Sequence, residues 1–265
     1  MLEVINARKI FLAGTPNEHV ALDNISFTLS EGEFVTLIGS NGAGKSTLFN
    51  AIGGTFWLNS GKILLHGEDI TYMPEHHRAS MIGRLFQNPA KGTAPNMTIE
   101  ENLALAYNRK LRKGLRIGVH REDVKLFREK LAMLDMGLEN RLKTKVGLLS
   151  GGQRQAVALL MATLGKPRLL LLDEHTAALD PAAAEKVMQI TKDIVNQENI
   201  TTMMITHNIQ SALETGSRTI MMDRGKIILD ITGKDRDNLT VGRLMELYSQ
   251  QSKDIVVSDR MLLNR

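Results

Sequence analysis

The stretch Gly39-Ser40-Asn41-Gly42-Ala43-Gly44-Lys45-Ser46-Thr47 decides the fold. It fits the pattern of a glycine, any four residues, Gly-Lys and then Ser or Thr, in which small residues let backbone N–H groups turn inward around a phosphate. The apolar run Phe34 to Ile38 precedes it, and the helical pattern Thr47 to Ile52 follows it. This context predicts a phosphate-binding loop (P-loop) that holds a nucleoside triphosphate, and it disfavours an ordinary glycine turn.

Two side chains of this loop have defined tasks. Lys45 can reach the β- and γ-phosphates, and the hydroxyl of Ser46 is placed to hold Mg²⁺. Backbone N–H groups supply the remaining contacts. The expected nucleotide-binding residues are therefore Gly39, Ser40, Asn41, Gly42, Ala43, Gly44, Lys45, Ser46 and Thr47.

The composition limits the other possibilities. A chain of 265 residues with 43% hydrophobic content can form one large α/β domain, or a core with an inserted subdomain. The lack of cysteine excludes disulfides, thiolate zinc sites and cysteine nucleophiles. A dispersed net charge of +4 is weak support for nucleic-acid binding. We see neither a signal peptide nor an apolar run long enough to cross a bilayer, so we expect a cytosolic chain that reaches a membrane through a partner.

The N-terminal and middle thirds of the chain differ in pattern. Short β-rich runs at Leu2 to Ile5, Asn24 to Leu29, Phe34 to Ile38 and Lys62 to Leu65 predict an antiparallel portion around the start of the core. From Asn96 to about Leu142 the spacing is helical, including a capping box at Thr98 to Glu101 and a helix over Arg121 to Met136.

The last third alternates helices and strands. Helices are expected over Ala156 to Leu164 and from Asp180-Pro181 to Asn196, with buried strands at Leu169 to Leu172 and Thr202 to Thr206. Such alternation predicts a parallel sheet covered by helices, with ligands at the carboxyl ends of its strands. Gly39, Asp173 and His207 would all lie there. A short amphipathic helix at Val241 to Tyr248 and a polar tail are expected to follow.

Two carboxylates end the run Leu169-Leu170-Leu171-Leu172-Asp173-Glu174. Asp173 can hold the Mg²⁺ shell that bridges the β- and γ-phosphates. Glu174, one residue further, can polarise an attacking water. Alone, this pattern fits a simple strand end equally well, but in the same α/β core as the P-loop it indicates a phosphoryl-transfer site.

The segment Leu149-Ser150-Gly151-Gly152-Gln153 predicts a second anion-binding helix start, with the helix running from Arg154. A chain with one P-loop has no evident use for a second phosphate cradle unless another copy supplies the nucleotide. The alternative is a plain Gly-Gly helix start.

Together these motifs resemble the ATP-binding subunit of an ABC transporter, over essentially the whole chain. The resemblance implies a P-loop α/β core with an antiparallel β subdomain and an inserted helical subdomain, binding ATP and Mg²⁺. It implies an ABC ATPase domain over residues 1–237 with a helical insert at about 88–155, followed by a short helix and tail at 238–265.

The resemblance also assigns site residues. It implies that Ser150, Gly151, Gly152 and Gln153 close on ATP held by a second copy. Gln87 would contact Mg²⁺ and water and move with the permease, and Asp180 would cross the dimer interface. His207 would touch the γ-phosphate, and Phe11 would stack on adenine. Taken singly, Gln87 fits a polar loop residue, His207 a satisfied strand-end histidine and Phe11 a core side chain.

One position departs from the family pattern. The family usually has proline after the catalytic glutamate, whereas this chain has His175. We interpret His175 as a structural residue. The strings Thr15 to Glu18, Gly92 to Thr98 and Glu174 to Thr176 resemble, more narrowly, the ATPases of tryptophan/tyrosine import systems.

The implied partners are a separate membrane permease, an extracytoplasmic substrate-binding protein and a second copy of this chain, with no nucleic acid. The implied location is peripheral, on the inner face of the cell membrane. Rival interpretations are an exporter or other membrane complex, a nucleic-acid ATPase of the same superfamily, and a lone P-loop kinase, which leaves Leu149 to Gln153 unexplained.

Overall fold

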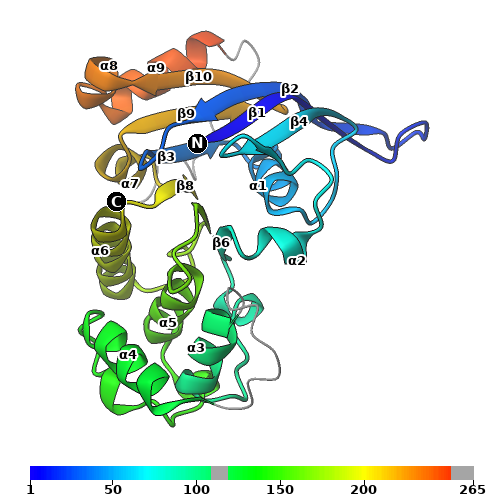
Figure 1. Ribbon diagram of the computed structural model, residues 1–265. Coiled ribbons are helices and arrows are strands. Elements are labelled where there is room, and N and C mark those ends of the chain that lie inside the picture. The colour runs from blue at the N-terminus through cyan, green and yellow to red at the C-terminus, as the bar shows by residue number, and fades with distance from the viewer. Residues whose placement is uncertain (109–118, 252–265) are drawn as a thin grey trace. The chain divides into compact units, whose positions relative to one another are not determined.

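The computed structural model describes residues 1–108 and 119–251 (Figure 1), so the expected polar tail lies outside the described residues. Contacts divide the chain into two units. The first joins residues 1–78 to the chain from residue 201 onward, and the second is residues 79–200. Both contain strands and helices, as the α/β prediction requires.

An antiparallel sheet in the order β2-β1-β4-β5 belongs to the first unit. Its strands are β1 (Leu2–Phe11), β2 (His19–Leu29), β4 (Ser60–Leu65) and β5 (Glu68–Asp69). The sequence predicted this sheet with shorter strands, and it wrongly included Phe34 to Ile38, which pair in parallel elsewhere. The reason for the shorter strands is local, because Asn6 and Asn24 have φ values of 48° and 58°, and register shifts in β1 break the alternation of side chains that marks a strand.

The P-loop strand lies in a second group of strands in the same unit. Strand β3 (Phe34–Gly39) pairs in parallel with β8 (Thr201–Ile205) on one side and with β9 (Arg218–Asp223) on the other. Strand β10 (Lys226–Thr232) runs antiparallel to β9. Every residue of β3 is buried, Thr36 included, which explains why apolar residues predominate on both faces of this strand.

Helices of this unit are α1 (Lys45–Gly53), α2 (Glu75–Arg78), α7 (Ile209–Thr215), α8 (Gly233–Asp237) and α9 (Val241–Gln251). The fully buried guanidinium of Arg78 donates to the carbonyls of Ala51 and Ile52 over 2.7 Å each. These carbonyls lie in the last turn of α1, where a helix needs outside donors.

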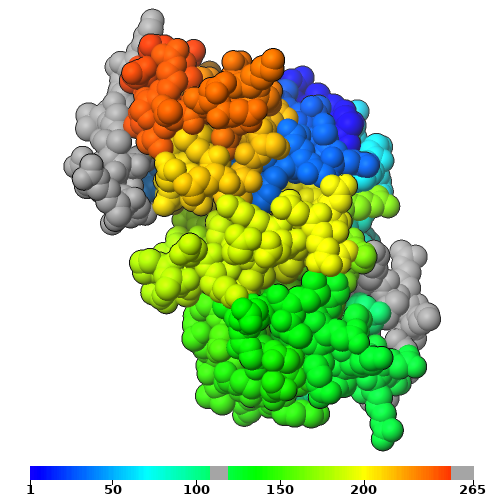
Figure 2. Space-filling model, turned by 90° about the vertical axis from the view of Figure 1, so that its left-hand side faces the viewer, coloured from blue at the N-terminus to red at the C-terminus, as the bar shows by residue number. Residues whose placement is uncertain are grey.

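Helix α9 is amphipathic, as predicted. Its Leu244 and Tyr248 are buried in a cluster with Ile38, Ile209 and Met221. Helices α8 and α9, orange to red, lie together beside β10 in Figure 1 and at the surface in Figure 2. The apolar face of α9 therefore completes the hydrophobic cluster to which Ile38 of β3 belongs.

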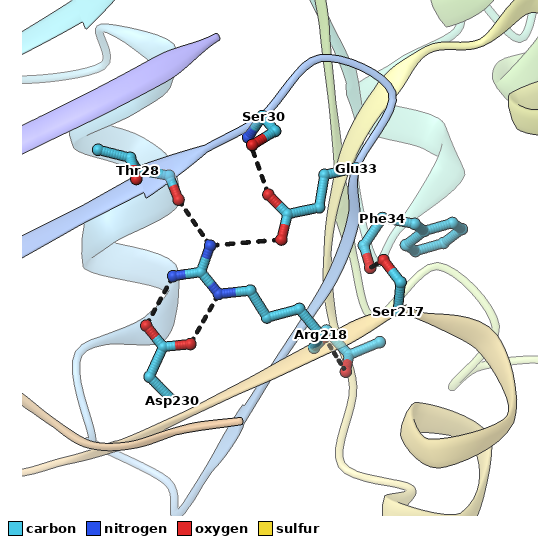
Figure 3. Close-up of polar contacts among 8 residues, drawn as sticks. Thr28, Ser30, Glu33, Phe34, Ser217, Arg218 and Asp230 are labelled. Carbon is cyan, nitrogen blue, oxygen red and sulfur yellow. Dashed lines mark hydrogen bonds and ion pairs between the residues drawn. The ribbon is translucent and has the colours of Figure 1, made fainter. Parts of the chain in front are cut away.

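Arg218 ties strands of this unit together (Figure 3). Its guanidinium donates to both carboxylate oxygens of Asp230, over 2.7 and 2.6 Å, so that β9 and β10 are joined by side chains as well as by backbone. It also donates to the carbonyl of Thr28 over 2.7 Å and to Glu33 over 3.3 Å. Pairing with Asp230 raises the pKa of Arg218, so the charge is permanent.

The second unit contains two parallel strands, β6 (Ile82–Leu85) and β7 (Leu169–Asp173), with a register that places Leu85 opposite Leu172. Its helices are α3 (Ile99–Asn108), α4 (Arg121–Ala132), α5 (Gly151–Thr163) and α6 (Pro181–Glu198), with single 3₁₀ turns at Pro89–Lys91, Leu138–Asn140 and Val146–Leu148. The predicted helical stretch is thus confirmed where it is described, except that α4 ends at Ala132 and not at the expected Met136.

Two predicted helix starts are confirmed at atomic detail. Thr98 and Glu101 form the capping box of α3, since each side chain accepts from the other residue's backbone N–H, over 3.3 and 2.7 Å. Asp180 caps α6 by accepting from the N–H of Ala183 over 3.0 Å.

Within residues 1–108 and 119–251, none of the helices combines the length and the apolarity that crossing a bilayer demands.

Candidate functional site

The P-loop begins where β3 ends. Gly39 lies opposite Met222 of β9 and has φ +147°, and a Cβ at Gly39 would lie 2.1 Å from the Met222 carbonyl oxygen. Only glycine fits there without a shift of the backbone. The chain can therefore leave the sheet edge and turn directly into the loop that Ser40, Asn41, Gly42 and Ala43 continue.

Lys45 is held inside this loop. Its side chain is buried, and Nζ donates to the carbonyls of Gly39 and Ser40 over 2.8 Å each. Gly44, in the left-handed conformation, is the N-cap of α1, and no acidic residue lies in the first turn of α1. The N–H groups of Lys45, Ser46 and Thr47 thus lie at a positive helix end, which can bind a phosphate.

The turn between β9 and β10 supports the P-loop from outside. Ser40 Oγ donates to Asp223 Oδ1 over 3.4 Å, and the N–H of Gly225 donates to the Ala43 carbonyl over 3.0 Å. Neither Asp223 nor Gly225 was predicted from the sequence. The Arg224-Gly225 pair marks a tight turn, but nothing in the sequence indicates that this turn lies beside residue 43.

His207 follows the strand next to the P-loop strand. Leu37 of β3 lies opposite Ile205 of β8, and the N–H of Thr206 donates to Leu37 over 3.3 Å. Asn208 then caps α7 by accepting from the N–H of Ser211 over 2.9 Å. His207 is therefore fixed between a strand end and a helix start, at the same edge of the sheet as Gly39.

Phe11 lies at the end of β1 and is half-buried. Its ring meets Phe56 edge to face, with centroids 5.4 Å apart, and Lys9 Nζ lies 5.2 Å from the Phe11 centroid and 4.8 Å from that of Phe56. Contacts with Phe56 and Lys9 therefore fix the orientation of the Phe11 ring. Phe11 was proposed from the sequence, whereas Phe56 and Lys9 were not.

In the second unit, Gln87 and Glu174 come together. Because β6 and β7 are parallel and in register at Leu85 and Leu172, the residues that follow them lie at one edge. Gln87 Nε2 donates to Glu174 Oε2 over 3.2 Å. Asp173 is the last residue of β7 and immediately precedes Glu174. This edge therefore presents two carboxylates and one amide.

Glu174 has an unusual backbone, with φ +46°. His175, the next residue, is buried, and its Nε2 lies 3.0 Å from Oγ1 of Thr191 on α6. Burial lowers the pKa of His175 to about 4, so the ring is neutral at neutral pH. These observations agree with the structural role expected for His175.

The Ser150-to-Gln153 segment starts α5. Ser150 Oγ accepts from the N–H of Gln153 over 3.2 Å, and Gln153 Oε1 accepts from the N–H of Ser150 over 3.3 Å. A Cβ on Gly151 would lie 3.2 Å from Leu179, and one on Gly152 3.1 Å from Ala183. The glycines therefore let α5 approach the start of α6 closely.

Helix α5 begins at Gly151, earlier than the expected start at Arg154, because this reciprocal cap stabilises an additional turn.

The candidate site residues are divided between the two units. The P-loop, Phe11 and His207 belong to the first unit. Gln87, Ser150 to Gln153, Asp173, Glu174 and Asp180 belong to the second.

Comparisons with known proteins give the family. Residues 22–177 match the family model described as ABC transporter. The chain is 42% identical over 252 residues to the tyrosine transport ATP-binding protein of Clostridioides difficile, covering 94% of this chain and 98% of that protein. It is 34% identical to the spermidine/putrescine import ATP-binding protein PotA of Mannheimia succiniciproducens, covering 94% of this chain and 63% of PotA.

Solved structures agree. The dimeric post-hydrolysis structure of the ATP-binding cassette MJ0796 with ADP and Pi matches at TM-score 0.75 and 30% identity, covering 88% of this chain and 98% of that one. The ADP conformation of the cassette MJ1267 matches at TM-score 0.76 and 28% identity, covering 94% and 98%. The chain therefore belongs to the ABC transporter family, as an ATP-binding subunit that hydrolyses ATP.

Proposed function

We propose that this chain drives solute import through a separate permease, by closing head to tail with a second copy around two ATP molecules. In each half of that dimer the P-loop of one copy holds ATP, and Ser150 and Gly152 of the other cover its γ-phosphate. Closure would pull on the permease through the helical insert and Gln87, and hydrolysis would reopen the pair. ATP binding and hydrolysis thus shift the population between closed and open states.

The proposed contacts follow the chemistry of each group. Lys45 and the amides of Gly39 to Thr47 bind the phosphates, and Phe11 stacks on adenine. Glu174 polarises the attacking water, with Gln87 orienting it and His207 touching the γ-phosphate. Asp180, already the cap of α6, would lie at the dimer interface.

Magnesium is the metal that this donor set suits. Ser46 offers a hydroxyl, Gln87 an amide oxygen and Asp173 a carboxylate, and hard oxygen ligands are what Mg²⁺ prefers. The described residues contain no group of three or more His, Cys, Asp or Glu side chains that could hold a metal ion. A cation held by few protein ligands together with phosphate oxygens needs no such group. Its role would be to neutralise charge on the phosphates.

The observation that carries the proposal is the start of α5. The Ser150 hydroxyl accepts from Gln153, and a hydroxyl that accepts can still donate its proton to a phosphate oxygen. Gly151 and Gly152 add N–H groups at the positive end of a helix of 13 residues. This is a second phosphate-binding helix start in one chain, which a partner's ATP would occupy.

The remaining assignments rest on the resemblance to ABC transporter ATPases, and the solute is suggested by the tyrosine transport ATP-binding protein. We propose a peripheral location on the inner face of the cell membrane, an extracytoplasmic substrate-binding protein in the same system, and an amino acid such as tyrosine or tryptophan as solute. We assign residues 1–237 to the ABC ATPase domain, with the helical insert at about 88–155, and residues 238–265 to a C-terminal helix and tail.

Reconstitution tests the proposal. The chain, its permease and its substrate-binding protein would be placed in vesicles, and uptake of labelled tyrosine, tryptophan, spermidine and sulfate would be measured with and without Mg·ATP. We expect ATP-dependent uptake of an aromatic amino acid. ATP-driven movement in the opposite direction would favour an exporter, and ATPase activity unaffected by the permease would contradict transport.

A further inference from the structure

The residue after Glu174 is an unexplained feature of the site. His175 is 2% exposed and stands where the family pattern has proline. The imidazole therefore does not reach solvent or a bound nucleotide, and the chemistry proposed above does not use it. Its only described side-chain partner is Thr191, on α6.

The direction of this hydrogen bond can be deduced. Thr191 is fully buried, and its hydroxyl donates to the carbonyl of Val187 over 2.8 Å. A threonine hydroxyl has one hydrogen, so Oγ1 can only accept from His175. His175 Nε2 therefore carries a hydrogen and donates it over 3.0 Å. His175 Nε2–H thus donates to Thr191 Oγ1, whose own hydrogen goes to the Val187 carbonyl. These two hydrogen bonds connect the loop after β7 to the second turn of α6.

The backbone beside His175 is strained. Glu174 has φ +46°, in the left-handed region that residues other than glycine, asparagine and aspartate rarely adopt. The N–H of Ala177 donates to the Glu174 carbonyl over 3.0 Å and closes the turn. Such a conformation persists only where the surroundings hold it. A proline at 175 would disfavour it, because the residue before proline prefers an extended backbone.

We propose that His175 is a positioning residue, which holds the strained Glu174 turn against α6 through Thr191 and so fixes the carboxylate for ATP hydrolysis. In this chain a buried side-chain hydrogen bond thus holds a turn that proline at position 175 would disfavour. The inference rests on the proposed role of Glu174 and extends it to the residues that aim its carboxylate at the attacking water.

The test uses the full chain with Mg·ATP and compares two threonines. Thr191→Val removes the acceptor and keeps the shape. Thr163→Val is the matched control, because Thr163 is also buried and donates to the carbonyl four residues earlier, Leu159, on its own helix. We expect Thr191→Val to lower kcat about tenfold to a hundredfold with KM for ATP within about twofold, since small misplacements of a catalytic group cost that much. Thr163→Val should leave both constants unchanged.

Substitutions at His175 give a second measurement. His175→Phe keeps a ring but has no donor, and it should lose kcat as Thr191→Val does. His175→Gln places an amide N–H at the same reach as Nε2, and it should restore most of the turnover. A purely space-filling role would favour Phe over Gln. Nucleotide binding and the thermal unfolding midpoint would be measured for every variant, and if His175→Phe fails to fold, the threonine pair decides.

Glu174→Gln, measured alongside, separates the two possible failures. Full turnover in Glu174→Gln would overturn the proposed role of Glu174 itself. If Glu174→Gln is inactive while folded Thr191→Val keeps kcat within about twofold of the starting chain, only the positioning role is wrong. Equal losses in His175→Gln and His175→Phe would also overturn it.

Discussion

Gln87 Nε2 lies 3.2 Å from Glu174 Oε2 and donates to it. The contact results from two parallel strands whose ends share one edge, with Leu85 opposite Leu172. An amide that donates to a carboxylate keeps its own oxygen available as a metal or water ligand. The pair can therefore orient a carboxylate and present an amide oxygen at the same place, and substitutions at both residues should act on hydrolysis rather than on folding.

Glu174→Gln should lower ATP turnover by about 10²–10⁴, the usual contribution of a positioned base, with ATP affinity retained. Steady-state phosphate release and equilibrium binding of ATP would be measured on the same preparation. Glu185→Gln, an exposed carboxylate on α6, is the control and should be neutral. If Glu174→Gln hydrolysed ATP as fast as the unsubstituted protein, Glu174 would have no role in the mechanism.

Lys45→Met should weaken ATP binding. The ammonium is held by the Gly39 and Ser40 carbonyls, in position to meet phosphate oxygens. A hydrogen bond to a charged group is worth about 1.5–3 kcal/mol, so affinity should fall by roughly ten- to a hundredfold. Titration calorimetry with ATP checks this, and Lys226→Met, at an exposed ion pair, serves as control. An unchanged dissociation constant would be incompatible with a phosphate contact.

Gly39→Ala should destabilise the chain far more than Gly42→Ala. At Gly39 the new Cβ would lie 2.1 Å from the Met222 carbonyl oxygen, so β3 and β9 must move apart. At Gly42, with φ +80°, nothing lies within 4 Å, and only backbone strain of about 1 kcal/mol is added. Urea unfolding would compare the two, with a difference of about 2 kcal/mol expected. Equal midpoints would mean that the strand pair tolerates the methyl group.

Local patterns were enough to predict the elements that hold the site. The P-loop, the capping box at Thr98 and the cap at Asp180 are each encoded within a few residues, where spacing determines structure. The Asp173-Glu174 strand end was also visible, because a buried parallel strand is a continuous apolar run.

Long-range partners were not predictable in this way. Asp223 supports Ser40 across 183 residues, and Arg218 reaches Thr28 across 190. Neither pair leaves a periodic or compositional signal, since such contacts depend on strand pairing. The His175–Thr191 bond is closer in sequence, yet it depends on how α6 packs on the loop after β7. The sequence therefore proposes the functional groups and the elements that carry them, and the structure adds the long-range contacts that orient those elements.

Glu198 should make stability depend on pH in the acidic range. Hydrogen bonds from Lys166 and then Lys130 lower the pKa of this carboxyl below its usual value near 4.5. When folding lowers the pKa of a carboxyl group, the ionised group stabilises the folded state fully at pH values above its pKa in the unfolded state. This contribution is lost as the pH falls through its pKa in the folded state. The difference in unfolding free energy between the starting chain and Glu198→Gln should thus be about 1 kcal/mol at pH 7 and shrink below about pH 4.5. Denaturant unfolding from pH 7 to 3 tests this, and a gap that widens on acidification would contradict it.

Arg218→Lys should destabilise the first unit even though the charge is kept. A guanidinium can donate to both oxygens of Asp230 and to Thr28 at once (Figure 3), whereas an ammonium cannot reproduce that planar fork. The Arg218 side chain is only 12% exposed, so unmade hydrogen bonds are not replaced fully by water. A loss of about 1–3 kcal/mol in unfolding free energy is expected.

Arg243→Lys provides the comparison for that loss. Arg243 pairs with Glu246 on α9 across one helical turn, with both side chains more than half exposed. Exposed pairs contribute about 0–1 kcal/mol, so Arg243→Lys should be nearly neutral in urea unfolding. If the two substitutions cost the same, the Arg218 cluster stabilises through charge alone, and its fork geometry has no separate effect. A larger loss of unfolding free energy for Arg218→Lys would show that the strands joined by Arg218 depend on the planar shape of its guanidinium.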